Sequence, residues 1–187
     1  MNLPNKLTVF RVILIPFFLV ALMLPVIPYG KWIAVGIFVV TSLTDLLDGK
    51  IARKYNLVTD FGKFMDPLAD KLLVCSAMIA LIDLERIPAW VVIVIIAREF
   101  IISGFRLVAS DNGVVIAASY WGKVKTTFQM IMVILLIVNL SENFPGAALG
   151  ITIAEQVLIY SSLLLTIISL IDYLVKNRKV LSEGNKK

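Results

Sequence analysis

The sequence contains no histidine and only one cysteine, Cys75. The lack of histidine excludes catalysis by a histidine base or a Ser-His-Asp triad, and it removes the usual zinc sites, for which one cysteine does not suffice. A single cysteine cannot form a disulfide within the chain, and a buried cysteine usually packs as a small apolar residue. Redox and zinc chemistry are therefore poor explanations for this chain.

Charged residues are also scarce, at 17%, whereas 59% of the residues are hydrophobic. The apolar residues occur in long runs rather than in the alternating or amphipathic patterns of a soluble domain. Crossing the hydrocarbon of a bilayer takes about 20 mostly apolar residues in a helix. The sequence therefore predicts an all-α, polytopic membrane protein with six transmembrane helices, near residues 10–28, 31–49, 64–82, 87–108, 124–141 and 152–175.

Only short segments remain between these spans, and no internal repeat is visible. We therefore expect a single integral-membrane catalytic domain over residues 1–187. The first apolar run contains Pro16 and Pro25 and lacks a small-residue cleavage site at its end, so we expect it to stay as the first span rather than to be removed as a signal peptide.

The basic residues predict the orientation in the membrane. The net charge is +5, but the lysines and arginines are scattered over short loops, which argues against a nucleic-acid surface. If the spans alternate in direction, one side holds most of these residues and the other side's loops hold only Lys31 and Arg86. The positive-inside rule then predicts that both termini and the loops 50–63 and 109–123 are cytoplasmic. Tryptophans lie at span ends, as in an aromatic belt: Trp32, Trp90 and Trp121.

Four aspartates occur near the cytoplasmic ends of the second and third spans: Asp45, Asp48, Asp66 and Asp70. Charged groups within spans are costly and usually serve a function. The first pair is separated by three positions and the second by four, so on helices each pair shares one face, about a turn apart. The short connection makes the two spans antiparallel neighbours, so the pairs can face each other. Four converging carboxylates would repel one another strongly unless cations neutralise them.

Oxygen ligands without histidine or cysteine favour hard ions such as Mg²⁺ or Mn²⁺. Four carboxylates can hold two such ions about 3.5–4 Å apart, a geometry that clamps the attacking and leaving oxygens of a phosphoryl displacement. Gly49 and Gly62 lie beside the pairs, where a missing side chain lets a ligand approach the backbone, and Arg53 suits a bidentate phosphate contact. These residues predict a two-metal site for phosphoryl transfer.

The same residues resemble the signature of the CDP-alcohol phosphotransferase family, D-x2-D-G-x2-A-R-x8-G-x3-D-x3-D, with every spacing kept. The opening residues 2–11 look most like the bacterial branch that makes phosphatidylglycerol phosphate. The resemblance implies the CDP-alcohol phosphotransferase fold and transfer of the phosphatidyl group from CDP-diacylglycerol to sn-glycerol 3-phosphate, with CMP as the other product.

The resemblance also implies roles for single residues. Two divalent metal ions, Mg²⁺ or Mn²⁺, would be bound by Asp45, Asp48, Asp66 and Asp70, and Asp70 would be the catalytic general base. The CDP-diacylglycerol site would comprise Asn5, Thr8, Gly49, Ala52, Arg53, Thr59 and Gly62. Members of the family are typically homodimers, so we expect a homodimer in a bacterial cell membrane, with the active site on the cytoplasmic side.

Because the acceptor carries a phosphate of its own, a basic pocket beside the metals is expected. The candidates are Arg98, Arg106, Lys123 and Lys125. Arg98 lies well inside an apolar run, where an arginine needs a partner or a watery cavity. The two lysines also suit attraction of anionic lipid. The remaining acidic residues are expected to be structural, with Glu99 pairing with a nearby arginine and with Asp83, Glu85, Glu142 and Glu155 in or beside outer loops.

Other readings stay open. Inositol phosphate, serine or phosphatidylglycerol as the acceptor would use the same four aspartates. A divalent-cation transporter would also place carboxylates on facing helices, but the chain shows no repeat and its aspartates lie close to one membrane face. A catalytically silent scaffold would have no reason to bear the electrostatic cost of the four aspartates. For the enzyme we expect a single displacement with inversion at phosphorus.

Overall fold

The computed structural model describes residues 3–54, 60–111, 116 and 119–178. Within its helices, the side chains of residues 3–4, 45–54, 60–64, 66–67, 70, 110–111 and 143 lie outside the description. The described part is all-helical, with six long helices, one short helix and one 3-10 turn: α1 (Leu3–Met23), α2 (Gly30–Lys54), α3 (Asp60–Asp83), α4 (Ala89–Asp111), α5 (Tyr120–Val138), α6 (Leu140–Asn143), η1 (Pro145–Ala147) and α7 (Ala148–Lys176).

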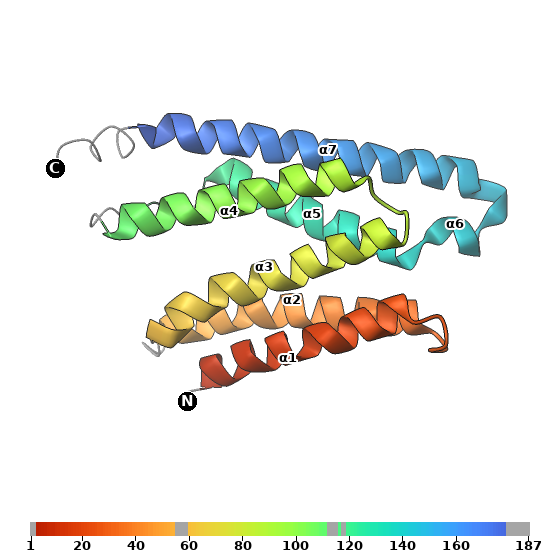
Figure 1. The fold of residues 1–187 in the computed structure, drawn as a ribbon, viewed down its shortest axis with the longest axis horizontal. Coiled ribbons are helices and arrows are strands. Elements are labelled where there is room, and N and C mark those ends of the chain that lie inside the picture. Colours follow the sequence, from red (N-terminus) through yellow and green to blue (C-terminus); the bar gives the residue numbers. More distant parts are fainter. Residues whose placement is uncertain (1–2, 55–59, 112–115, 117–118, 179–187) are drawn as a thin grey trace.

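The long helices form a bundle in which successive helices run in opposite directions (Figure 1). Helix α1 packs against α2 and α3, whereas α7 packs against α4 and α5. Contacts of α5 with α2 and α3, and of α3 with α4, join the two groups. We call the end of the bundle where α2 ends at Lys54 and α3 begins at Asp60 the aspartate end; the beginning of α1 and the ends of α4 and α7 lie there too (Figure 1).

In the described part of the chain, six long helices lie where the six spans were expected, but the predicted loop over residues 50–63 was wrong. Helix α2 continues through Lys54, and α3 already begins at Asp60. Residues 50–54 include lysine, alanine and arginine, which are good helix formers, so the helix outlasts the apolar run that indicated the span. The loop predicted over 109–123 is shortened in the same way, because α4 ends at Asp111 and α5 begins at Tyr120.

The turn between α1 and α2 depends on a close backbone approach. Helix α1 ends at Met23, just before Pro25 and Pro28, which lack the backbone N–H that a helix needs. The chain then returns so closely that a Cβ atom built on Gly30 would lie 2.3 Å from the backbone oxygen of Ala21. Only glycine fits this position without a shift of the backbone.

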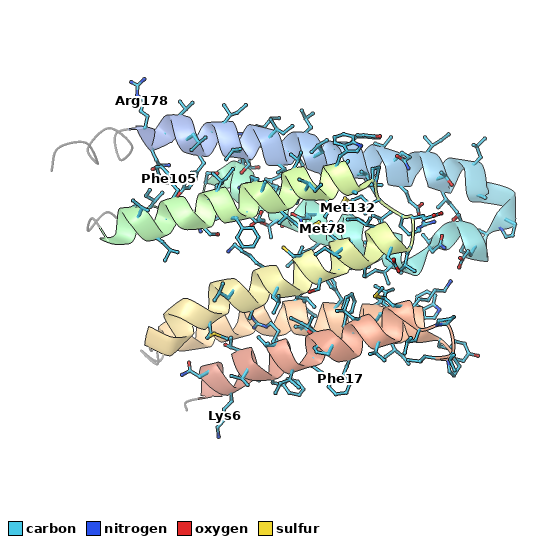
Figure 2. The ribbon with its side chains drawn as sticks, viewed as in Figure 1. Lys6, Phe17, Met78, Phe105, Met132 and Arg178 are labelled. Carbon is cyan, nitrogen blue, oxygen red and sulfur yellow. The ribbon has the colours of Figure 1, made fainter. Side chains whose placement is uncertain are left out.

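The core consists of apolar side chains from the long helices. Phe18, Phe38, Met78 and Met132 are fully buried, and Figure 2 shows Met78 and Met132 between helices, whereas Phe17 points outward. Many large apolar residues are nevertheless exposed, especially along α7: Leu149, Ile153, Val157, Leu164, Ile171 and Val175. Apolar surface of this extent is rare on soluble monomers and suits contact with lipid.

In the described part of the chain, three segments are long and apolar enough to cross a membrane: Asn5–Met23, Tyr120–Glu142 and Pro145–Lys176. A shorter apolar segment covers Gly30–Thr44 of α2. The chain is thus a membrane protein with several apolar helices. The predicted tryptophans do lie at helix ends, with Trp32 near the start of α2, Trp90 near the start of α4 and Trp121 near the start of α5.

Candidate active site

The four aspartates lie on helical backbone near the aspartate end. Asp45 and Asp48 belong to α2, and Asp66 and Asp70 belong to α3, which packs against α2. On these helices, the spacings of three and four residues place the two members of each pair about one turn apart. The side chains of all four lie outside the described residues. Their convergence on metal ions stays a prediction, and the described residues alone contain no cluster of metal-binding side chains.

The residues predicted to contact CDP-diacylglycerol come from three helices. Asn5 and Thr8 lie one turn apart at the start of α1, and both side chains are buried. Four of the other residues lie on the helical backbone of α2 or α3, and nothing beyond their backbone is described: Gly49, Ala52, Arg53 and Gly62. Thr59 lies outside the described residues.

Arg11 is a third buried polar residue on α1, and the sequence did not predict it as part of the site. It follows Thr8 at the same spacing of three residues that separates Asn5 from Thr8, so the three share one face of the helix. The side chain of Arg11 is only 2% exposed. The regular spacing of these three polar residues in a mostly apolar helix was the signal that could have identified it.

A buried group of charges joins α4, α5 and α7, and we call Arg98, Glu99, Lys125 and Ser169 the ion cluster. Nη1 of Arg98 donates to Oε1 of Glu99 at 2.9 Å, and Nη2 of Arg98 donates to Oγ of Ser169 at 2.5 Å. Nζ of Lys125 donates to the same oxygen of Glu99. The expectation that Glu99 pairs with a nearby arginine is confirmed, and its second partner, Lys125, was missed.

The ion cluster carries more positive than negative charge. It contains two cations and one carboxylate, and the side chains of Arg98 and Lys125 are only 8% and 2% exposed. Nε of Arg98 is buried and has no hydrogen-bond partner in the part of the chain that the structure describes. Buried charge is costly unless it is paired. The arrangement is therefore suited to receive an anion.

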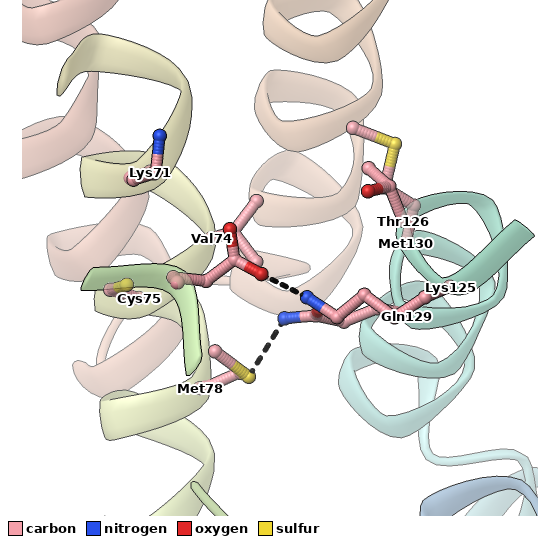
Figure 3. A pocket seen from close by; sticks show the side chains of 9 residues that line it. Lys71, Val74, Cys75, Met78, Lys125, Thr126, Gln129 and Met130 are labelled. Carbon is pink, nitrogen blue, oxygen red and sulfur yellow. Dashed lines mark hydrogen bonds and ion pairs between the residues drawn. The ribbon is translucent and has the colours of Figure 1, made fainter. Parts of the chain in front are cut away.

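A small cavity lies beside the ion cluster, between α3, α4 and α5 (Figure 3). Its volume is about 40 Å³, which is room for two or three water-sized groups. Its lining combines apolar, sulfur-containing and polar side chains: Lys71, Val74, Cys75, Met78, Glu99, Lys125, Thr126, Gln129 and Met130. Gln129 donates a hydrogen bond to the sulfur of Met78 at 3.2 Å across the floor of this space (Figure 3).

The cavity begins close to the aspartates of α3. Lys71 directly follows Asp70 on α3. Val74 lies about one helical turn after Asp70, which is about 6 Å along the helix axis. The cavity therefore lies between the part of α3 that directly follows Asp70 and the residues Glu99 and Lys125 on the facing helices.

The structure brings together two of the four predicted acceptor residues. Arg98 and Lys125 meet at Glu99, whereas Arg106 and Lys123 have exposed side chains outside the ion cluster. Arg106 lies about two turns nearer the aspartate end of α4, with its guanidinium carbon 5.7 Å from the ring centroid of Tyr173 on α7, a cation–π contact.

A second, partly buried ion pair lies near the opposite end of the bundle. Arg86, between α3 and α4, donates from Nη2 to both carboxylate oxygens of Glu155 at 2.8 Å. Glu155 was expected to be a structural residue in or beside an outer loop. The ion pair agrees with a structural role, but the expected position was wrong, because α7 begins at Ala148 and places Glu155 inside the bundle. Glu142 fits the expectation, since it is exposed and pairs with Lys31 at 3.0 Å.

The sequence matches the family model described as CDP-alcohol phosphatidyltransferase over residues 1–168. It is 42% identical to the CDP-diacylglycerol–glycerol-3-phosphate 3-phosphatidyltransferase of Bacillus subtilis strain 168, over 98% of this chain and 99% of that protein. The proteins of the same name from Haemophilus influenzae Rd and Escherichia coli K12 are 41% and 40% identical, each over 92% of this chain. The match covers 91% of the Haemophilus protein and 93% of the Escherichia protein.

Proposed function

The chain belongs to the CDP-alcohol phosphatidyltransferase family, and from this premise we propose that it transfers the phosphatidyl group of CDP-diacylglycerol to sn-glycerol 3-phosphate. The products are phosphatidylglycerol phosphate and CMP. The observation that carries the proposal is the similarity, over nearly the full length, to enzymes named for this donor and this acceptor. The four-aspartate signature alone supports only the donor half of the reaction, which all acceptors share.

The donor set of the proposed site fits divalent metal ions. Asp45, Asp48, Asp66 and Asp70 offer only carboxylate oxygens, and they lie on two packed helices near one end of the bundle. Oxygen ligands of this kind favour Mg²⁺ or Mn²⁺. Two such ions, when bound, would offset the repulsion among the carboxylates and stabilise negative charge on the diphosphate.

In the proposed reaction the acceptor hydroxyl oxygen attacks the phosphorus that carries the lipid. The bond between this phosphorus and the CMP oxygen breaks as the new bond forms, and Asp70 takes the proton of the hydroxyl. Asn5, Thr8, Gly49, Ala52, Arg53, Thr59 and Gly62 hold the nucleotide lipid. Positioning and neutralisation of charge then do most of the work, as in other phosphoryl transfers.

For the acceptor phosphate we propose Arg98 and Lys125, which are supported by the net positive charge of the ion cluster and by the adjacent cavity. Arg106 lies nearer the aspartate end, where it would contact the acceptor phosphate as the acceptor enters the site. Lys123 completes the predicted set at the start of α5.

We further propose that the chain forms one catalytic domain with six transmembrane helices and assembles as a homodimer in a bacterial cell membrane. Both termini and the aspartate end would face the cytoplasm. The concentration of lysine and arginine on the loops and ends of this side supports this orientation.

The test is CMP release from CDP-diacylglycerol by the purified protein in detergent with Mg²⁺ or Mn²⁺. Glycerol 3-phosphate, inositol phosphate, serine and phosphatidylglycerol are offered in parallel. The proposal requires turnover with glycerol 3-phosphate alone. Turnover with another acceptor would leave the metal site standing and overturn the acceptor. No turnover with any acceptor would overturn the proposal and favour a cation transporter or a scaffold.

A further inference from the structure

Glu99 has one carboxylate oxygen that the ion cluster leaves unused. Oε1 accepts hydrogen bonds from both Arg98 and Lys125. In the described part of the chain, no donor binds Oε2. The side chain of Glu99 lines the cavity and is 19% exposed, more than either of its cationic partners. An ionised carboxylate oxygen beside a cavity is a strong hydrogen-bond acceptor and can bind a donor group of a ligand there.

The position of Glu99 matches the middle of the proposed acceptor. The reacting hydroxyl must lie near Asp70, and the cavity begins beside that turn of α3 at Lys71 and Val74. The acceptor phosphate would lie near Arg98 and Lys125, which Glu99 holds. Between its reacting hydroxyl and its phosphate, glycerol 3-phosphate carries one further hydroxyl, on its central carbon. The cavity has room for a group of this size.

We propose that Glu99 is a specificity-determining residue of the acceptor site. Oε2 accepts a hydrogen bond from the central hydroxyl of a phosphorylated polyol, while Oε1 holds Lys125 and Arg98 in place for the phosphate. The inference rests on the proposed function, since it concerns the acceptor of that reaction. A site built to bind a substrate hydroxyl rejects the analogue without it, because the bound analogue would cover the carboxylate oxygen without offering it a donor.

The decisive comparison uses two acceptors that differ only in this hydroxyl. Propane-1,3-diol monophosphate keeps the reacting primary hydroxyl and the phosphate of glycerol 3-phosphate but lacks the central hydroxyl. We expect the wild-type protein to favour glycerol 3-phosphate in kcat/KM by about tenfold or more. In Glu99→Gln the preference should shrink, because a bond to a neutral amide is weaker than one to a carboxylate.

A double variant separates this role from simple charge balance. Glu99→Leu with Lys125→Met removes one negative and one positive charge, so the net charge of the ion cluster stays the same, and Arg98 keeps Ser169 as a hydrogen-bond partner. Both acceptors carry the phosphate, so loss of Lys125 affects both, and the ratio between them isolates Glu99. We expect this ratio to fall to about threefold or less. Glu155→Gln is the matched control, because Glu155 is also a buried, arginine-paired glutamate but lies near the opposite end of the bundle; its ratio should equal that of the wild type.

The outcomes are distinct. If the wild type uses glycerol 3-phosphate but treats both acceptors alike, the role of Glu99 is overturned while the proposed function stands. If the double variant keeps the full wild-type preference, Glu99 only balances charge and the proposal is again overturned. If the wild type releases no CMP with glycerol 3-phosphate, both proposals fall together. Should the double variant fail to fold, Glu99→Gln, which keeps the size and shape of the side chain, decides: an unchanged wild-type preference in Glu99→Gln overturns the proposal.

Discussion

Lys125 on α5 donates to the same oxygen of Glu99 on α4 that also accepts from Arg98, so one carboxylate holds two cations inside the bundle. The contact spans 26 positions of sequence and fixes the approach of α4 and α5 beside the cavity. Buried ion pairs contribute little net stability when intact, but they are costly to break from one side.

The first prediction concerns this pair. Lys125→Met leaves Glu99 paired with Arg98 alone and should destabilise the protein by about 1.5–3 kcal/mol, because a hydrogen bond between charged groups is lost but no buried charge is left without a partner. Lys123→Met is the control, since the side chain of Lys123 is exposed, and it should change little. Thermal unfolding in detergent measures both. Glu99→Leu combined with Lys125→Met should be less stable than Lys125→Met, because Arg98 then lies buried without a carboxylate. A double variant as stable as Lys125→Met would contradict this account.

The second prediction concerns the general base. Asp70→Asn should lower kcat by a factor of about 10² to 10⁴, the range of general acid–base catalysis. Asp83→Asn provides a control on the same helix, since Asp83 lies at the opposite end of α3 and is exposed. CMP release at saturating substrate measures the effect. Equal rates for the two variants would remove Asp70 from the chemistry.

The third prediction concerns the binding of the acceptor by Arg106. Arg106→Ala should raise KM for glycerol 3-phosphate by about tenfold, the effect of losing a hydrogen bond to a charged group, and should affect KM for CDP-diacylglycerol less. Steady-state kinetics with each substrate varied in turn gives both constants. Arg178→Ala, an exposed arginine just beyond α7, should change neither. An equal rise in both constants for Arg106→Ala would count against an acceptor role.

The fourth prediction concerns the metal ions. Treatment with EDTA should abolish CMP release, and addition of Mg²⁺ or Mn²⁺ should restore it, because four carboxylates without bound cations repel one another and cannot neutralise a diphosphate. The measurement is activity after chelation and after re-addition. Full activity in excess EDTA would show that the aspartates act without a metal ion.

The fifth prediction concerns the turn between α1 and α2. Gly30→Ala should destabilise the protein strongly, since the new Cβ would lie 2.3 Å from a backbone oxygen of Ala21. Gly36→Ala makes the same change within α2, where a Cβ would meet nothing within 4 Å. It should be neutral or stabilising by up to about 1 kcal/mol, because alanine favours the helix. Thermal melts of the two variants in one detergent would refute the steric argument if they coincide.

Helix boundaries show where hydropathy stops being informative. The expected spans ended where the apolar runs end, but α2 continues through Lys54 and α3 begins at Asp60. Hydropathy reports where a helix can be covered by lipid, whereas the helix itself is limited by backbone hydrogen bonding and helix propensity. The two limits differ most at the aspartate end, where polar residues continue both helices.

The membrane class, the number of long helices and the four-aspartate signature can be recognised in the sequence, because apolar runs and spacings of three or four residues are properties of single helices. The sequence also indicates that Arg98 needs a partner. The packing of the helices was needed to show that Glu99 binds both Arg98 and Lys125 beside a cavity, and that Glu155 packs against Arg86. These contacts join residues 26 and 69 positions apart, so they depend on which helix faces pack together. Local sequence patterns do not indicate which faces these are.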